Sequence, residues 1–147
     1  MRDTLIPGLR HESRTIVTPA MLVPALAGQL PPFADMPAVL ATAMMVGFVE
    51  ATCIDLMRPH LDEGEHSVGI HIDMSHAAPT SAGSDLRAEV EVETVAGRIL
   101  SFRVRAFDSA GPIGEGTHRR AVICMSRFSE KIVERAGTAT VGTGRPT

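Results

Sequence analysis

Hydrophobic and polar residues alternate with a period of two through much of the second half of the chain. In residues 86–92, Leu, Ala and Val stand at the even positions and Arg and Glu at the odd positions. The same alternation occurs in residues 99–107 and, less regularly, in residues 67–76 and 113–125. Because successive side chains of a strand point to opposite faces, this period predicts four strands with one buried face each. Turn residues between the segments favour antiparallel pairing.

A different pattern occupies residues 36–49, which contain no charged side chain and a single threonine, Thr42. Asp35 is a suitable N-cap residue and Pro59 stops a helix, so we expect one long helix from Asp35 to the residue before Pro59. The segment is apolar on nearly every side until Glu50. That is typical of a helix wrapped by other elements.

The predicted order is a strand at residues 12–18, the long helix, and then four antiparallel strands. With 147 residues, the chain has the size of a single domain. We therefore predict one α+β domain, residues 1–136, with the sheet curled over the helix. Prolines interrupt the apolar segment before the helix, which is typical of a flap. Residues 137–147 are rich in Gly and Thr and are expected to be a disordered tail.

Composition excludes several classes of function. A formal net charge of −3 and the absence of Trp and Tyr give neither charge attraction nor stacking platforms for nucleic acid. The chain has no apolar signal core and no apolar run that spans a bilayer, so we expect a cytoplasmic protein without membrane contact. Cys53 and Cys124 lack ligand spacing and are expected to be free thiols.

Three polar residues fall where core residues are expected. The step from Thr42 to Glu50 is two helical turns plus about 80°, so both side chains lean toward one side of the helix. His76 is in phase with the apolar residues of its strand. A carboxylate and a His that meet in an apolar pocket can exchange protons near neutral pH. Alternatively, Glu50 and His76 form a structural pair and Thr42 caps its own helix.

Three segments carry a family resemblance: TAMMVGFVE at residues 42–50, SVG at 67–69 followed by Ser75 and His76, and IGEGTHRRAVI at 113–123. In this order they resemble the hotdog-fold acyl-CoA thioesterases, specifically the branch of fluoroacetyl-CoA thioesterases. The likeness extends over residues 31–128. It implies a hotdog fold, in which an antiparallel sheet wraps a long helix, and a homodimer with active sites between the subunits.

The resemblance also implies roles for individual residues. The catalytic set would be Thr42, Glu50 and His76. The backbone at Gly69 would lie beside the thioester carbonyl. Further residues implied to contact the substrate, in the flap or in the cleft for CoA, are Phe33, Met36, Gly116 and Arg120. His118 shares a strand face with Gly116 and Arg120 and is a further candidate for substrate contact, the alternative being a packed or solvated strand residue. Met36 departs from the family, because it stands where a second aromatic residue is expected.

The implied substrate is an acyl-CoA or a related acyl thioester, and neither a cofactor nor a metal is implied, since CoA is part of the substrate. Glu50 would either activate water or attack the thioester directly, and the residues leave both routes open. A hotdog dehydratase or hydratase is one alternative, although its His-Phe-Pro-Gly segment is missing. A non-catalytic acyl-CoA-binding module is the other. A metal site that combines His71, Asp73 and His76 conflicts with strand alternation.

Overall fold

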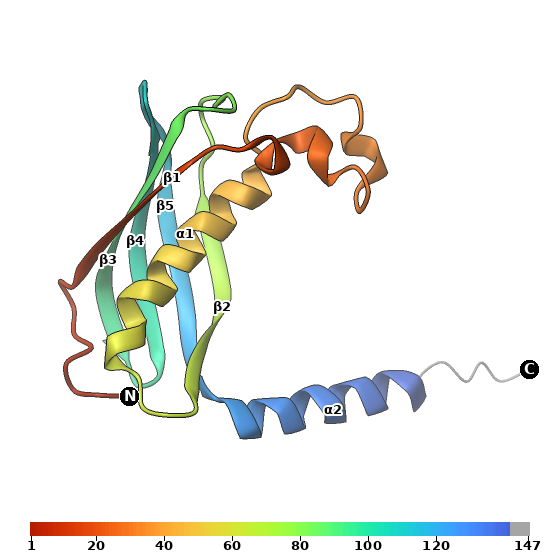
Figure 1. Cartoon of the computed structure of the whole chain (residues 1–147). Helices are drawn as coiled ribbons and strands as arrows, with labels where there is room; N and C mark the ends of the chain where they lie inside the picture. Colours follow the sequence, from red (N-terminus) through yellow and green to blue (C-terminus); the bar gives the residue numbers. More distant parts are fainter. Residues whose placement is uncertain (142–147) are drawn as a thin grey trace, which may run out of the picture.

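The computed structural model describes residues 1–141 of the chain. Five strands form one antiparallel sheet in the order β1-β3-β4-β5-β2. They are β1 (Arg10–Ile16), β2 (Glu65–Met74), β3 (Asp85–Ala96), β4 (Ile99–Asp108) and β5 (Gly111–Cys124). The long helix α1 (Thr42–Met57) crosses one face of this sheet, and α2 (Met125–Val141) leads away from it (Figure 1). The predicted α+β class and element order are confirmed.

The hairpin of β3 and β4 follows the predicted alternation. Val90 pairs with Val104 in the register, and both face the core. The buried residues of the two strands are Leu86, Ala88, Val90, Val92, Leu100, Phe102, Val104 and Ala106. Each large aliphatic side chain buried there contributes about 1.5–3 kcal/mol relative to exposure. Packing on the sheet therefore holds α1 in place.

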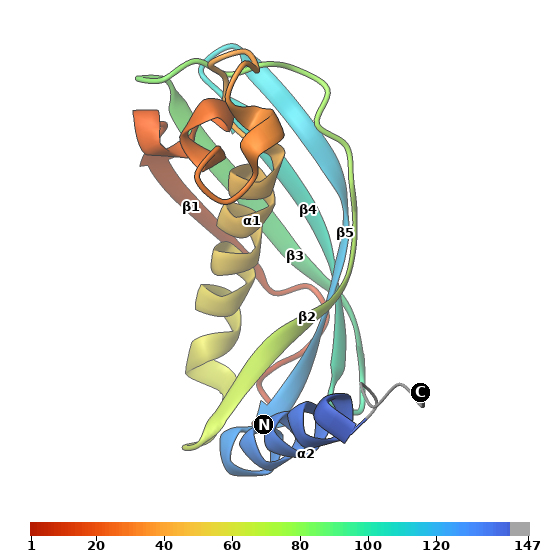
Figure 2. The ribbon, with the colours of Figure 1, turned by 90° about the vertical axis from the view of Figure 1, so that its right-hand side faces the viewer.

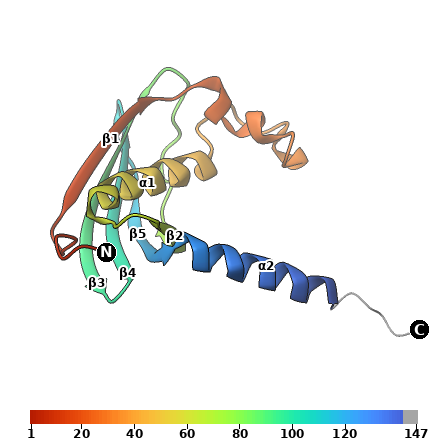
Figure 3. The same ribbon diagram turned by 60° about the horizontal axis from the view of Figure 1, so that its bottom comes forward.

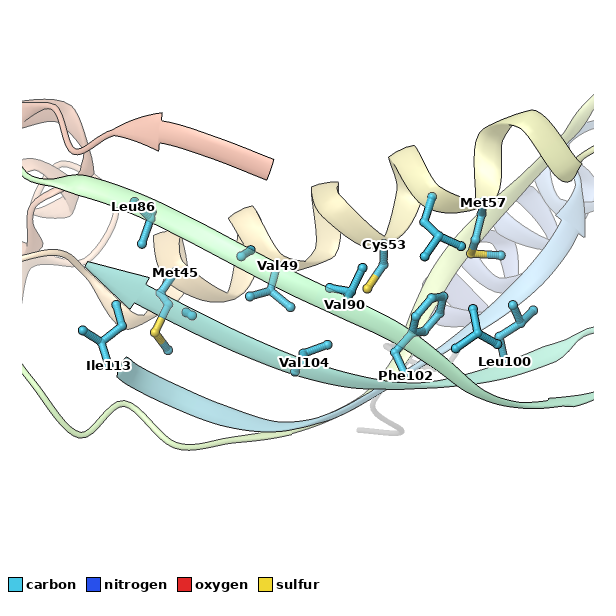
Figure 4. Close-up of a cluster of buried hydrophobic side chains, with 14 of the residues drawn as sticks. Met45, Val49, Cys53, Met57, Leu86, Val90, Leu100, Phe102, Val104 and Ile113 are labelled. Carbon is cyan, nitrogen blue, oxygen red and sulfur yellow. The ribbon is translucent and has the colours of Figure 1, made fainter. Parts of the chain in front are cut away.

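One side of α1 supplies the other half of the core. Met45, Val49, Cys53 and Met57 follow one another at four-residue spacing and are fully buried. Figure 4 shows these side chains pointing toward the strands. The opposite side of the helix, at Ala43, Gly47, Ala51 and Asp55, is exposed. The sheet thus covers one side of α1, whereas the sequence predicted a helix wrapped on nearly every side.

The helix starts at Thr42 and not at Asp35 as predicted. Ala41 is its N-cap residue. Before it, residues 34–39 form turns and bends, and the amides of Leu40 and Ala41 bond to distant segments. The amide of Leu40 donates to the carbonyl of Thr80 at 2.8 Å, and the amide of Ala41 donates to a flap carbonyl at 2.9 Å. These bonds hold the backbone amides away from the helical pattern. The predicted end is nearly right, since α1 ends at Met57.

The flap, residues 19–36, consists of three short 3-10 turns, Pro19–Met21, Val23–Leu26 and Pro31–Phe33. Each turn has a proline within its first two positions, where the missing amide hydrogen costs no helical bond. The flap lies at the N-terminal end of α1 (Figure 2). The proline-broken segment therefore has local structure but forms no long helix.

Strand β2 contains a bulge that the alternation did not predict. The register with β5 shifts between Gly69 and His71, so Ile70 is an extra residue. The shift reverses the phase of the residues before it. Gly69 faces α1, whereas Ile70 is 45% exposed. The prediction that Ile70 points inward and Gly69 outward is wrong, while Met74 packs against the core as predicted.

Helix α2 was not predicted. It continues through residues 137–141, where the sequence analysis expected the disordered tail to begin. The rest of that expected tail, residues 142–147, lies outside the described residues. Figure 3 shows α2 pointing away from the sheet, and Ile132 and Val133 on it are exposed. Within the described chain, no helix combines the length and apolar character needed to cross a lipid bilayer.

Candidate active site

Thr42 and His76 form one polar pair at the start of α1. A hydrogen bond of 2.7 Å joins Thr42 Oγ1 to His76 Nδ1. The other ring nitrogen, Nε2, is buried and has no hydrogen-bond partner among the described residues. Ala41 is the N-cap residue and the Thr42 hydroxyl bonds to His76, so the alternative in which Thr42 caps its own helix is wrong. We call these two residues the N-terminal pair.

Two glycines of β5 determine where His76 lies. A Cβ at Gly116 would overlap the carbonyl oxygen of Asp73, and a Cβ at Gly114 would overlap that of Ser75. The backbone leading to His76 can therefore lie directly on β5 only because neither residue has a side chain. Gly116 also borders an open cavity of about 800 Å³. That cavity is lined mainly by charged side chains and contains no residue of the predicted catalytic set.

Glu50 lies two turns further along α1, in a different set of contacts. Its Oε1 accepts a hydrogen bond from Arg120 Nη1 at 3.1 Å and lies 3.6 Å from His118 Nε2. The Glu50 side chain is 39% exposed, whereas that of Arg120 is 4% exposed. The alternative in which Glu50 pairs with His76 is wrong, because the partners of Glu50 come from β5.

The guanidinium of Arg120 is fixed by Ser67. Arg120 Nε donates to Ser67 Oγ at 2.9 Å, and Nη2 donates to the Ser67 carbonyl, also at 2.9 Å. Ser67 was not among the predicted site residues. A usable signal was that His118 and Arg120 alternate in phase with the core residue Val122, because a buried Arg requires acceptors on a neighbouring strand.

Gly69 places its backbone next to the carboxylate. A Cβ at this position would overlap Glu50 Oε1 and would lie 3.1 Å from His118 Cε1. Burial lowers the pKa of His118. Burial also raises the pKa of Cys53, one turn after Glu50, to about 12. We call Glu50, Ser67, Gly69, His118 and Arg120 the mid-helix cluster.

The predicted catalytic set thus falls into two places within one chain. Thr42 and His76 meet in the N-terminal pair, while Glu50 belongs to the mid-helix cluster. Eight residues of α1 correspond to a rise of about 12 Å, so Thr42 and Glu50 of one chain do not contact the same atom. The side chain of His118 is 2% exposed.

The two flap residues of the predicted site, Phe33 and Met36, lie in the segment that precedes α1. Phe33 is partly buried at the end of the third turn, and Met36 is 44% exposed. The flap is joined to the start of α1 by the hydrogen bond between Ala41 and Met21. Within residues 1–141, no group of three or more His, Cys, Asp and Glu side chains is arranged to hold a metal ion.

Comparison with known proteins gives a consistent result. Residues 17–126 match the family of fluoroacetyl-CoA-specific thioesterases. The fluoroacetyl-CoA thioesterase of Streptantibioticus cattleyicolor is 39% identical over 135 residues, which cover 92% of this chain and 97% of the relative. A solved structure of a fluoroacetyl-CoA thioesterase has a TM-score of 0.87 and 39% identity, with 90% of this chain and 98% of that chain covered.

Less similar structures agree on the fold. A Thermus thermophilus protein of the thioesterase superfamily has a TM-score of 0.78 at 25% identity, covering 92% of this chain and 96% of its own. A hotdog-like protein from Thermanaerovibrio acidaminovorans has a TM-score of 0.74 at 21% identity, and the match covers 88% of this chain and 91% of that protein. The hotdog fold is confirmed, and thioester hydrolysis is favoured over the dehydratase and the non-catalytic binding module. The chain therefore belongs to the fluoroacetyl-CoA-specific thioesterase family and is a hotdog-fold thioester hydrolase.

Proposed function

We propose that this enzyme hydrolyses a small acyl-CoA to the free acid and CoA in the cytoplasm, as a homodimer, with Thr42, Glu50 and His76 as catalytic residues. The position of Glu50 is the observation that carries the proposal. Its carboxylate is 39% exposed, is oriented by Arg120, and lies against the side-chain-free backbone of Gly69. The substrate brings its own CoA, so the proposal requires no cofactor.

The chemistry needs few groups. A thioester carbonyl placed at Gly69 would meet a carboxylate from α1 and a backbone that can be approached closely. In the water route, Glu50 takes a proton from water, the oxygen adds to the carbonyl carbon, the C–S bond breaks, and the departing thiolate takes up the proton. In the direct route, a carboxylate oxygen of Glu50 attacks the carbonyl carbon, the C–S bond breaks, and the CoA thiolate leaves behind an anhydride. Water then hydrolyses the anhydride to the free acid and the Glu50 carboxylate, and the proton released from water goes to the thiolate.

The N-terminal pair would act on the charge that develops in this reaction. Nε2 of His76 is buried without a partner among the described residues, so it can bond to a substrate atom without giving up an existing bond. Thr42 is the first residue of α1, at the end of the helix that favours negative charge. These features support a role with the oxyanion or the leaving thiolate.

A homodimer would unite the two places. If a two-fold axis sets the α1 helices of two copies antiparallel, the N-terminal pair of one copy approaches the mid-helix cluster of the other. Two features of the single chain support such an arrangement. Exposed small residues recur every fourth position on α1, at Ala43, Gly47 and Ala51, so another helix can approach closely. Strand β2 is an edge of the sheet, and edge strands favour pairing.

Solved structures of relatives support a small acyl group. One structure is of a variant fluoroacetyl-CoA thioesterase in complex with fluoroacetate and CoA, at 41% identity. Another holds acetyl-CoA in a threonine-to-serine variant, at 39% identity. We extend the class of small acyl-CoA to this enzyme. Met36, where the sequence analysis expected a second aromatic residue, makes preference for a fluorinated acyl group a separate question.

The catalytic proposal is tested by Glu50→Gln. The amide keeps the volume and an oxygen for Arg120 but removes the base or nucleophile. The substrates are acetyl-, fluoroacetyl-, propionyl- and isobutyryl-CoA, and hydrolysis is measured as the release of free thiol. The rate for the best substrate of this panel should fall by roughly two orders of magnitude or more. The melting temperature should change little, because Glu50 is partly exposed. A folded variant with wild-type turnover ends the catalytic assignment.

The homodimer is tested by Gly47→Arg. Gly47 is exposed in the single chain, and a Cβ there meets nothing within 4 Å. Arg is also the better helix former by up to about 1 kcal/mol, so the fold of one chain should not suffer. If a second copy covers this side of α1, light scattering should show a monomer for Gly47→Arg and a dimer for the wild type and for Gly47→Ala. A wild type that is monomeric at micromolar concentration contradicts the proposal.

A further inference from the structure

The hydrogen bonds around Arg120 determine which nitrogen of the His118 ring carries a hydrogen. Nη1 of Arg120 has two hydrogens, and it lies 3.1 Å from both Glu50 Oε1 and His118 Nε2. A guanidinium has no acceptor, so Nε2 of the imidazole has to accept. Nδ1 of the same ring lies 2.8 Å from the carbonyl oxygen of His71. A carbonyl only accepts, so Nδ1 carries the hydrogen.

These contacts admit a single form of the ring, the neutral imidazole with its hydrogen on Nδ1. The surroundings hold the ring in this form. The side chain is 2% exposed, and the ring stacks on Phe102 with centroids 6.5 Å apart and planes at 29°. Burial lowers the pKa of His118, and Arg120, Glu50 and His71 are the charged or titratable groups that act on it. The lowered pKa agrees with the neutral ring that the hydrogen bonds require.

Any other form of His118 would change the contacts of Glu50. A hydrogen on Nε2 would point at the hydrogens of Arg120 Nη1, which lies 3.1 Å away. The same Nε2 is 3.6 Å from Glu50 Oε1, so a protonated ring would compete with Arg120 for that oxygen. The neutral ring leaves the oxygen to Arg120. It also gives the second hydrogen of Nη1 a fixed direction.

We propose that His118 is a positioning residue that holds Arg120 Nη1 toward Glu50 through its unprotonated Nε2 and so fixes the carboxylate against Gly69. In this role His118 contacts no substrate and makes no hydrogen bond to Glu50, since its Nε2 lies 3.6 Å from Oε1. It acts through Arg120, whose other end is anchored on Ser67. The inference rests on the proposed catalytic role of Glu50 and adds to it the group that keeps the carboxylate aimed.

Two variants separate positioning from packing. His118→Phe keeps a ring beside Phe102 but has no acceptor, whereas His118→Gln offers a carbonyl oxygen to Arg120. His118→Phe should lower kcat about tenfold or more and leave KM within about twofold. His118→Gln should recover most of kcat. His11→Gln, at an exposed position on β1, is the control for loss of a His and should match the wild type.

Melting temperatures and a double variant complete the kinetic test. If the activity of both His118 variants follows their melting temperatures and Gln gives no recovery, the role is purely structural and the inference is overturned. In a Glu50→Gln background, His118→Phe should cause little further loss of activity. His118 acts only by orienting the Glu50 carboxylate, which is already absent there. An independent, additive loss overturns the inference as well.

The outcomes keep the two proposals apart. Wild-type turnover of Glu50→Gln overturns the catalytic role of Glu50 and, with it, the basis of this inference. Wild-type kcat of His118→Phe beside an inactive Glu50→Gln overturns the positioning role alone. If His118→Phe does not fold, the inference is still tested by nitrogen NMR of the six histidines in the wild-type protein. The spectrum should show Nδ1 of His118 protonated and Nε2 unprotonated at neutral pH, and the opposite tautomer contradicts the inference.

Discussion

The two polar sites on α1 differ in how far one chain completes them. In the mid-helix cluster, Arg120 makes four hydrogen bonds, to Ser67, Glu50 and His118. In the N-terminal pair, His76 has a single bond, to Thr42, and its buried Nε2 has no partner among residues 1–141. The first site is fixed before a substrate arrives. The second has a hydrogen-bonding position to give to a substrate, a water or a second copy.

This difference has a kinetic meaning. Groups fixed in advance stabilise a transition state without reorganising, so their loss acts on the chemical step. A group that gains its last partner from the substrate contributes to binding and to catalysis together. We therefore expect variants of the mid-helix cluster to lose more activity than variants of the N-terminal pair. Glu50→Gln, described above, is the largest effect in this order, and the three variants below follow it.

Gly69→Ala should have the next largest effect, because it breaks the fixed site without removing a functional group. The added Cβ would overlap Glu50 Oε1 and crowd His118 Cε1, so the carboxylate has to move. Misplacement by about 1 Å can cost roughly a hundredfold in rate. Hydrolysis rate and melting temperature check this outcome. Gly137→Ala on α2, where a Cβ meets nothing within 4 Å, is the matched control and should keep wild-type rates. Equal activity of the two variants would mean that the contact between Gly69 and Glu50 is irrelevant to catalysis.

Thr42→Val should cost less, about tenfold. The branched shape stays and the hydroxyl that bonds His76 Nδ1 is removed. A positioned hydrogen bond is worth roughly 1–1.5 kcal/mol, and 1.4 kcal/mol corresponds to a factor of ten. Thr42→Ser keeps a hydroxyl and should retain most activity. Steady-state rates of both variants decide the point, and a loss for Thr42→Val as large as that for Glu50→Gln would place the two sites in one functional unit.

Sequence reasoning succeeded where one physical rule decides the structure. The hairpin of β3 and β4 lies between a core and solvent, so alternation alone assigned Val90 and Val104 correctly. It failed where contacts distant in sequence decide. The bulge at Ile70 depends on the pairing of β2 with β5. The late start of α1 depends on the bond from Leu40 to Thr80.

The site was foreseen in part for the same reason. Helical phase places Thr42 and Glu50 on one side of α1, but phase says nothing of the axial rise of about 12 Å between them. Their separation into two sites therefore appears only in the structure. Arg120 was expected at the substrate, and its partner Ser67 was not foreseen, because the contact requires the register of β2 and β5. Substrate contact of Arg120 remains a prediction.

Phe33→Ala should give the smallest effect and tests whether the flap contacts the acyl group. The flap lies at the N-terminal end of the helix (Figure 2), so its apolar side chains are candidates to contact an acyl group beside Thr42. Shortening Phe33 should then change the relative rates for acetyl-, propionyl- and isobutyryl-CoA by roughly threefold to tenfold, since pocket contacts of this size discriminate weakly. Ile132→Ala on α2, exposed at 55%, should leave the ratios unchanged. Fold stability should change little, because Phe33 is only partly buried.

Met36→Phe adds an aromatic side chain to the same flap and should shift the ratios in the opposite direction. Unchanged ratios in both flap variants would mean that the flap does not contact the acyl group.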